Sequence, residues 1–342
     1  MTKFLFSLLL LFLVSCKESK KMNIDQRHAL IANVNLENNL LTYSYWKNND
    51  YAIKIEDLAT NKTFFFTKIK DKSFTEPRIN DHKLYFPESN DTFICLDYKT
   101  KKVIWKLPTK GRIREFQIVK DTVIIASIAV YGLVAINANT GKVMYELLIH
   151  SDKGCLVDDA PRPIGFDENN FFVTNFNGAS ISAYEISSGK MVWSKKENPT
   201  SFSNFIVSGK YIFIGSNDSY KTGEIMLIET KTGKVVYSQD SKFEIMMDPV
   251  SIKNKVYYYT YDSKLNEFDI EKKTSKILYK FSPKNDISGS QIYLLDNALY
   301  FQDMNFDLNK LNLNTLKKEI IGKGEKGLLG VYKINNKVKF IY

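Results

Sequence analysis

A short phrase returns seven times along the chain, and it constrains the fold more than any other feature. It consists of an acidic residue or Asn, Thr or Ser three positions later, usually Gly and Lys next, and in six copies an aromatic residue eight positions after the start. The last positions of the copies are residues 65, 105, 145, 193, 237, 279 and 320. A period of about 40–45 residues is typical of propeller blades or arrays, because each unit cannot bury its own apolar face.

Each copy is predicted to be the turn of a β-hairpin. Around the third copy, the β-rich runs 134–136 and 143–145 flank Asn-Ala-Asn-Thr-Gly-Lys. The acidic or Asn side chain opens such a turn by accepting from backbone amides, and Gly supplies the position with φ > 0. Where Gly is lost, we expect reshaped turns. The residues that replace it are Asn61, Lys101, Ser275 and Leu316. The copies are Asp57-Thr60-Lys62-Phe65, Asp97-Thr100-Lys102-Trp105, Asn137-Thr140-Gly141-Lys142-Tyr145, Glu185-Ser188-Gly189-Lys190-Trp193, Glu229-Thr232-Gly233-Lys234-Tyr237, Glu271-Thr274-Lys276-Tyr279 and Asn312-Thr315-Lys317-Ile320.

A second pair of apolar runs lies upstream of each hairpin, for example 116–119 with 123–126 and 205–207 with 211–214. Four strands per unit make a propeller blade. No long segment after residue 25 has the 3.6-residue periodicity of a helix. The fold class is therefore predicted to be all-β, a propeller of four-stranded blades. Upstream pairs occur eight times and the hairpin seven times, so we expect eight blade positions, with seven as the alternative.

The repeat resembles that of the PQQ-like β-propellers, which include quinoprotein dehydrogenases and BamB-like lipoproteins of the outer-membrane barrel-assembly machinery. The resemblance covers roughly residues 30–342. It implies that the aromatic residue ending each phrase packs between neighbouring blades. That blade-docking role falls on Phe65, Trp105, Tyr145, Trp193, Tyr237 and Tyr279. Quinoprotein dehydrogenases use adjacent cysteines, a calcium site and a catalytic Asp, and this chain has no Cys-Cys pair.

The first residues predict export and lipid attachment. One Lys, a short apolar core and small residues precede Cys16, which is typical of a secretory signal and too short for a membrane span. Leu13-Val14-Ser15-Cys16 resembles a bacterial lipobox, and an ordinary signal peptide is the alternative. The expected organisation is a signal peptide over 1–15, lipidated Cys16 with a polar tether over 16–29, and a propeller over 30–342. Lys17 beside the Cys resembles the outer-membrane sorting context, whether facing the periplasm or the cell surface.

The net charge and the cysteines limit the kinds of partner and cofactor that we expect. The net charge of +10 comes mostly from Lys spread through turns, and no basic run with interleaved aromatic residues marks a nucleic-acid groove. Cys95 and Cys155 are the remaining thiols. An oxidising envelope would permit a disulfide between them, and the alternative is a buried Cys95 that acts as a small apolar residue. No His or Cys spacing typical of a metal site and no phosphate-binding loop occurs, so we expect no metal, cofactor or nucleic acid.

One loop stands apart. The 48-residue spacing between Tyr145 and Trp193 places extra residues in 150–163, which is expected to join the outer strand of one blade to the inner strand of the next. Such connections share one face near the channel mouth, where loops often carry function. Guanidinium groups there can bind a carboxylate bidentately, or they can form rim salt bridges with Glu115 or Asp158. The carboxylates of the loop can also simply be solvated. The candidate partner-binding residues are Arg112, Arg114, His150, Asp152, Asp158, Asp159 and Arg162.

Two classes of function fit these features. The first is a monomeric, non-enzymatic scaffold, anchored to the membrane by acylated Cys16, that holds an envelope protein such as a barrel-assembly component by strand addition or loop contacts. The second is a propeller that binds a glycan or cofactor, or acts as an enzyme, at the outer membrane. A ligand or enzyme site requires carboxylates with perturbed pKa values that converge at the channel mouth. The sequence contains no catalytic set, which favours the scaffold.

Overall fold

The computed structural model is built from antiparallel strands, and it contains no helix in the residues that it describes. No described helix is long and apolar enough to cross a membrane. The predicted signal peptide, Cys16 and nearly all of the tether lie outside the described residues. The structure describes residues 29–35, 39–47, 50–60, 62–71, 75–149, 160–174, 180–196, 201–217, 223–241, 245, 248–282, 291–324, 327–334 and 336–341.

Consecutive strands pair with each other to form seven four-stranded sheets and one two-stranded sheet in the described residues. The first three sheets are β1–β4 (Ala29–Asn35, Leu40–Lys47, Asp50–Asp57, Lys62–Ile69), β5–β8 (Arg78–Asn80, Lys83–Ser89, Thr92–Asp97, Lys102–Pro108) and β9–β12 (Ile113–Val119, Val123–Ile128, Gly132–Asn137, Val143–Leu148). The next two are β13–β16 (Ile164–Phe166, Asn170–Thr174, Ser180–Glu185, Met191–Lys196) and β17–β20 (Ser201–Ser208, Tyr211–Asn217, Gly223–Glu229, Val235–Ser241). The last are β21–β24 (Val250–Ile252, Lys255–Thr260, Lys264–Asp269, Thr274–Lys280), β25–β28 (Tyr293–Leu295, Ala298–Gln302, Asp307–Asn312, Lys318–Lys323) and β29–β30 (Gly330–Ile334, Lys337–Ile341).

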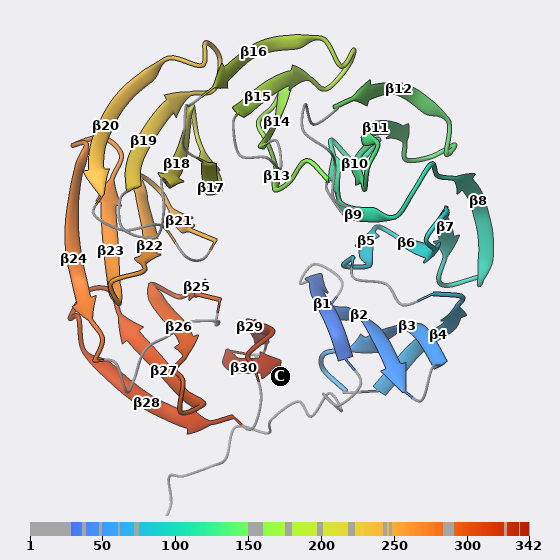
Figure 1. Ribbon diagram of the computed structural model, residues 1–342. Coiled ribbons are helices and arrows are strands. Elements are labelled where there is room, and N and C mark those ends of the chain that lie inside the picture. Colours follow the sequence, from blue (N-terminus) through green and yellow to red (C-terminus); the bar gives the residue numbers. More distant parts are fainter. Residues whose placement is uncertain are drawn as a thin grey trace, which may run out of the picture.

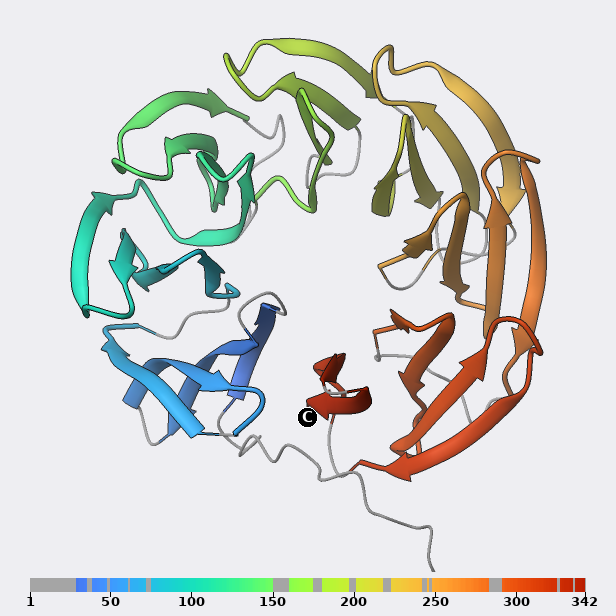
Figure 2. The same cartoon turned by 180° about the vertical axis from the view of Figure 1, so that it is seen from behind.

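The sheets stand around a ring as propeller blades (Figure 1). The first strand of each sheet lies nearest the centre and the fourth strand forms the rim, as the view from behind also shows (Figure 2). The predicted phrases lie in the turns between third and fourth strands, and the upstream pairs are the first and second strands. The all-β propeller of four-stranded blades is thus confirmed.

The core is divided among the seams between neighbouring sheets. Each hydrophobic cluster in the described residues combines side chains of two successive sheets; for example, Trp105 packs with Ile124 and Ile136. The second and third strands supply most of this core, because they are covered on both faces and read as continuous apolar runs such as Val123–Ile128. Packing between sheets therefore holds the ring together.

The two turns of each blade on the face opposite the blade connections are tied by one backbone hydrogen bond. The residue that follows the acidic or Asn residue of the phrase donates its N–H to a carbonyl in the turn between the first and second strands. The seven pairs are Leu58 to Asn39, Tyr98 to His82, Ala138 to Thr122, Ile186 to Asn169, Thr230 to Lys210, Ile270 to Asn254 and Leu313 to Asn297, at 2.8–3.1 Å. We call this side of the ring the turn face.

These bonds correct the register of the sixth phrase. Ile270 occupies the donor position, so the residue that opens the turn is Asp269 and not Glu271. Asp269 Oδ1 accepts from the N–H of Lys272 at 2.9 Å, as the acidic residues of other copies do. Because Asp269 and Glu271 are both acidic, the sequence allowed either residue to open the turn. The hydrogen bond from Ile270 N–H to Asn254 O identifies Asp269 as the opening residue. Glu271 therefore lies within the turn, and its side chain does not open it.

The expected reshaping of the turns that lack Gly was wrong at two positions. Lys101 and Leu316 adopt φ of 60° and 55°, close to the 70° of Gly141. The surrounding hairpin therefore imposes the left-handed conformation in spite of the Cβ. The sixth turn keeps the same geometry in its corrected register, because Lys273, four positions after Asp269, has a positive φ of 54°, whereas Ser275 lies in β24. Asn61 lies outside the described residues.

The two-stranded sheet fills the gap between the last and the first four-stranded sheets. Strand β29 contacts both β25 and β1. Tyr332 and Ile341 pack with Leu41 and Tyr43 of the first sheet. Phe340 packs with Tyr300 of the seventh sheet on the other side. Side-chain packing on both sides thus closes the ring at this seam. The predicted count of eight blade positions stays a prediction, because this last unit has two strands in the described residues.

Candidate functional site

Aromatic side chains of the rim strands reach onto the turn of the following blade. Gly141 accommodates the Trp105 ring, and a Cβ there would lie 2.7 Å from it. The indole N–H of Trp105 donates to the Ala138 carbonyl at 2.9 Å. Two further seams repeat this arrangement, Tyr145 on Gly189 and Trp193 on Gly233. Their polar atoms donate to Ile186 O and Thr230 O at 2.7 and 2.8 Å.

The other predicted blade-docking residues lie at seams that lack this glycine. Phe65 is buried in the cluster shared by the first and second sheets. Tyr237 packs on Phe268 of the following sheet, with ring centroids 5.2 Å apart. Tyr279 lies under Lys318 of the following sheet, whose Nζ is 5.5 Å from the ring centroid.

A pocket of about 430 Å³ lies where inner strands enter the ring from the blade connections. Its wall combines residues of the second to sixth sheets and the segments that precede them, with Phe116 and Phe205 as aromatic surface. We call it the channel pocket. Its charged lining consists of Glu76, Arg78, Arg114, Glu115, Arg162 and Asp248.

Arg78 is held in place from two directions. Its Nη2 pairs with Glu76 Oε2 at 3.0 Å, and its guanidinium carbon lies 5.9 Å from the Phe116 ring centroid. Its Nε is buried and has no hydrogen-bond partner among the described residues. A buried donor without an acceptor is costly, and an incoming carboxylate or phosphate oxygen would relieve that cost.

Glu115 forms part of the same wall. Its Oε1 accepts from Gln117 Nε2 at 3.0 Å and from the Ile164 N–H at 3.1 Å. Burial raises the pKa of the Glu115 carboxyl above its ordinary value, and the charge of Arg78 lowers that pKa in part. Across the channel, Asp248 accepts from Gln291 Nε2 at 2.9 Å.

The structure brings together two of the predicted partner-binding residues, Arg114 and Arg162, in this pocket. The backbone of Arg162 is fixed by Thr174, whose Oγ1 donates to its carbonyl at 2.6 Å. Arg112 points elsewhere, and its Nε donates to Asn90 Oδ1 at 2.7 Å in the turn between β6 and β7. The remaining four, His150, Asp152, Asp158 and Asp159, lie outside the described residues, as does Cys155.

Sequence reasoning missed Arg78, Glu76 and Asp248 in this site. One signal was available: the chain has only five Arg residues, and Arg78, Arg112, Arg114 and Arg162 all lie at or just before an inner strand. The described residues contain no group of three or more His, Cys, Asp or Glu placed to hold a metal ion. Cys95 is a free, buried thiol whose pKa burial raises to about 12.

Known structures share this architecture. A computationally designed protein, Ika8, is 13% identical with a TM-score of 0.68, covering 91% of this chain and 92% of that chain. Sqt1 of Saccharomyces cerevisiae is 10% identical with a TM-score of 0.67, covering 89% and 88%. BamB from Moraxella catarrhalis is 13% identical with a TM-score of 0.61, covering 80% and 82%. At these identities the likeness shows the fold.

The comparison with curated proteins gives no significant match. A family model does match: the one described as outer membrane protein assembly factor BamB aligns with residues 59–239, just over half of the 342 residues. The matched segment begins in the first phrase and ends in the rim strand of the fifth sheet, so it follows the repeat. The chain therefore belongs to the PQQ-like propeller family of the outer membrane protein assembly factor BamB.

Proposed function

We propose that this protein is a non-enzymatic scaffold of the bacterial cell envelope, anchored by an acylated Cys16, that binds a protein partner of outer-membrane assembly. Family membership supports the interaction role, and the lipobox-like Leu13-Val14-Ser15-Cys16 supports the anchor. Several acyl chains would hold the protein stably at a membrane, since each buried CH₂ contributes about 0.8 kcal/mol.

The observation that carries the proposal is the gathering of Arg78, Arg114 and Arg162 in one pocket on the side of the blade connections. Guanidinium groups bind carboxylates with two parallel hydrogen bonds, and Arg is enriched at the energetic centres of interfaces. Phe116 and Phe205 add apolar surface beside them. The pocket thus suits a protein segment that presents an acidic side chain next to an apolar one.

The rim supplies a second contact mode. Among the described residues the fourth strands have one unpaired edge, and several expose neighbouring apolar side chains, such as Val103 and Ile104 on β8 and Phe64 and Phe66 on β4. An unpaired edge of this kind can accept a strand from another protein. Strand addition at the rim and acidic-group binding in the channel pocket are compatible with one extended partner.

The experiment is affinity purification with cross-linking of the lipidated protein from detergent-solubilised envelopes. Arg114→Glu/Arg162→Glu reverses two charges in the channel pocket, and Lys142→Glu/Lys190→Glu is the matched control on the turn face. We expect barrel-assembly components to be enriched by the unmodified protein and the control, and lost with the Arg variant. Cys16→Ser should release the protein from the membrane fraction.

Equal enrichment by both charge variants would contradict the role of the channel pocket. An intact fold that enriches no envelope protein would overturn the scaffold itself. The channel pocket, where burial raises the pKa values of the Glu115 and Asp248 carboxyls beside the arginines, would then favour a polar ligand, the second candidate function for this propeller.

A further inference from the structure

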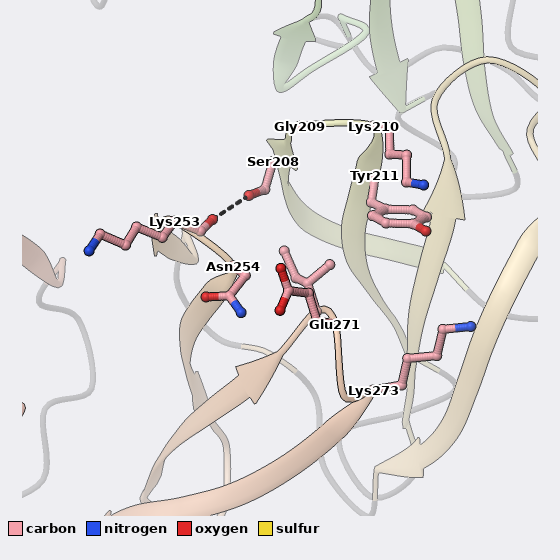
Figure 3. Close-up of a pocket in the computed structure, with 9 residues that line it drawn as sticks. Ser208, Gly209, Lys210, Tyr211, Lys253, Asn254, Glu271 and Lys273 are labelled. Atoms are coloured by element: carbon pink, nitrogen blue, oxygen red, sulfur yellow. Dashed lines mark hydrogen bonds between the residues drawn. The ribbon is translucent and has the colours of Figure 1, made fainter.

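A second hollow, of about 790 Å³, opens on the turn face between the fifth and sixth sheets (Figure 3). We call it the seam hollow and define it by Ser208, Lys210, Tyr211, Asn254, Glu271 and Lys273. These residues come from three turns, those between β17 and β18, β21 and β22, and β23 and β24. It belongs to a different face from the channel pocket and shares no residue with it.

The same positions are closed at the seam between the second and third sheets. There Lys83 Nζ donates to Asn139 Oδ1, and Asn80 Nδ2 donates to Asp121 Oδ1 at 3.2 Å. The strand registers make Tyr211 the counterpart of Lys83, and the tie between turns makes Glu271 the counterpart of Asn139. The donor and acceptor that bridge one seam are thus replaced by an aromatic ring and a carboxylate at the other.

The seam of the hollow also lacks the turn glycine. Lys273 has the positive φ that Gly233 has one blade earlier, where the Trp193 ring lies against the glycine. With a Cβ at this position, the preceding aromatic residue, Tyr237, packs on Phe268 instead. A Cβ built on Gly209 would meet no other described atom within 4 Å, so the space beside the turn between β17 and β18 is open as well.

The turns that carry the polar side chains of the seam hollow are held by hydrogen bonds to backbone carbonyls. Lys210 O accepts from Thr230 N–H at 3.0 Å, and Asn254 O accepts from Ile270 N–H at 2.8 Å. Ser208 Oγ donates to Lys253 O at 3.3 Å, and this bond joins the β17–β18 turn to the β21–β22 turn. Figure 3 shows the side chains of Glu271 and Asn254 between these turns, with the Tyr211 ring beside them and the lysines at the margin.

From this chemistry we infer that the seam hollow binds an acidic saccharide. A sugar ring can pack on the half-buried Tyr211 ring, and its hydroxyls can donate to Glu271 and pair with Asn254. Lys210 and Lys253 outnumber the single carboxylate and favour a ligand with a negative group, whereas Lys273 Nζ donates to Val236 O at 3.2 Å. An acidic peptide fits less well, because its side chains offer no sugar ring to pack on Tyr211 and no hydroxyl groups to donate to Glu271.

The test is isothermal titration calorimetry of the soluble Cys16→Ser protein with a uronic-acid trisaccharide, maltotriose, inorganic phosphate and a hexaglutamate peptide. We expect the acidic trisaccharide to bind at least tenfold more tightly than the other three probes. Vesicles containing a phosphorylated disaccharide lipid form a further arm. Binding to the free trisaccharide, to the vesicles or to both supports the proposal and identifies the source of the sugar.

Tyr211→Lys/Glu271→Asn installs the side chains that close the seam between the second and third sheets, and it should weaken binding at least tenfold. Lys210→Gln/Lys253→Gln should weaken binding of the acidic sugar and reduce its salt dependence, whereas Lys142→Gln/Lys190→Gln should change neither. Absence of sugar binding, equal binding of hexaglutamate, or affinity unchanged in both seam variants would overturn the proposal. The lysine variant keeps the test decisive if the double variant fails to fold. If the seam variants still enrich the envelope partner in the affinity purification, the loss of sugar binding is independent of the proposed scaffold function.

Discussion

At the scale of single residues, the three glycines that receive an aromatic ring have two separate requirements. Each has φ of about 70°, which a side chain resists, and each lacks room for a Cβ beside the ring. Gly209 separates the two effects, since its φ is 58° but the space around it is open. The contribution of seam packing can therefore be measured by difference.

Gly233→Ala should lower the free energy of unfolding by about 2–4 kcal/mol, because it combines left-handed strain with a clash against Trp193. Gly209→Ala should cost only about 1–2 kcal/mol, the strain itself. Urea denaturation of both variants at one pH tests this. Equal losses would show that the Trp193 ring yields at no cost, which would remove the proposed blade-docking role from that seam.

Glu115 gives a pH dependence whose sign is fixed by its environment. Its folded pKa is raised, so the folded state holds the proton more tightly than the unfolded chain, and this stability is lost as the pH rises through the folded pKa. Glu115→Gln keeps an acceptor for the Ile164 N–H and removes the charge. Thermal melts should show a higher Tm for the variant at pH 8 and a smaller difference toward pH 4. A difference that grows as the pH falls would contradict the raised pKa.

At the scale of the hairpin, the fold forces lysine and leucine into a conformation that glycine adopts freely. Lys101 and Leu316 keep the turn geometry of the phrase at φ near 60°. Lys101→Gly and Leu316→Gly should each stabilise the protein by about 0.5–1 kcal/mol, because relief of roughly 1–2 kcal/mol of strain exceeds the entropy cost of glycine. Chemical denaturation measures this, with Lys99→Gly in the same turn as a destabilising control. Loss of stability at both sites would mean that the side chains contribute more than the strain costs.

Much of the architecture could be predicted at this scale, because the turn chemistry repeats and its period sets the blade. The register of the sixth phrase could not, since Asp269 and Glu271 are both acidic and only the bond from Ile270 to Asn254 distinguishes them. The channel pocket could be predicted only in part. Arg114 and Arg162 were recognised from their connections, whereas Arg78 and Asp248 join them through ring geometry that no local pattern records.

At the scale of the whole molecule, the ring depends on the packing of β29 and β30 against the first and seventh four-stranded sheets. Tyr332 and Ile341 are buried against Leu41 and Tyr43, and Phe340 is buried against the seventh sheet. Removal of residues 327–342 should expose both seams and produce aggregating or domain-swapped species. Size-exclusion chromatography with light scattering, alongside thermal melting, tests this. An unchanged oligomeric state with an unchanged Tm would show that the seven four-stranded sheets close by themselves.

The closing hairpin also sets an order of events during synthesis. The first sheet is made early, yet the surface that covers Leu41 and Tyr43 belongs to β29 and β30, which follow all seven four-stranded sheets in the sequence. Until those residues leave the ribosome or the export channel, the nascent product keeps an uncovered apolar seam that chaperones and proteases can recognise. Translation products that stop before β29 would keep that seam uncovered and stay open to the same recognition.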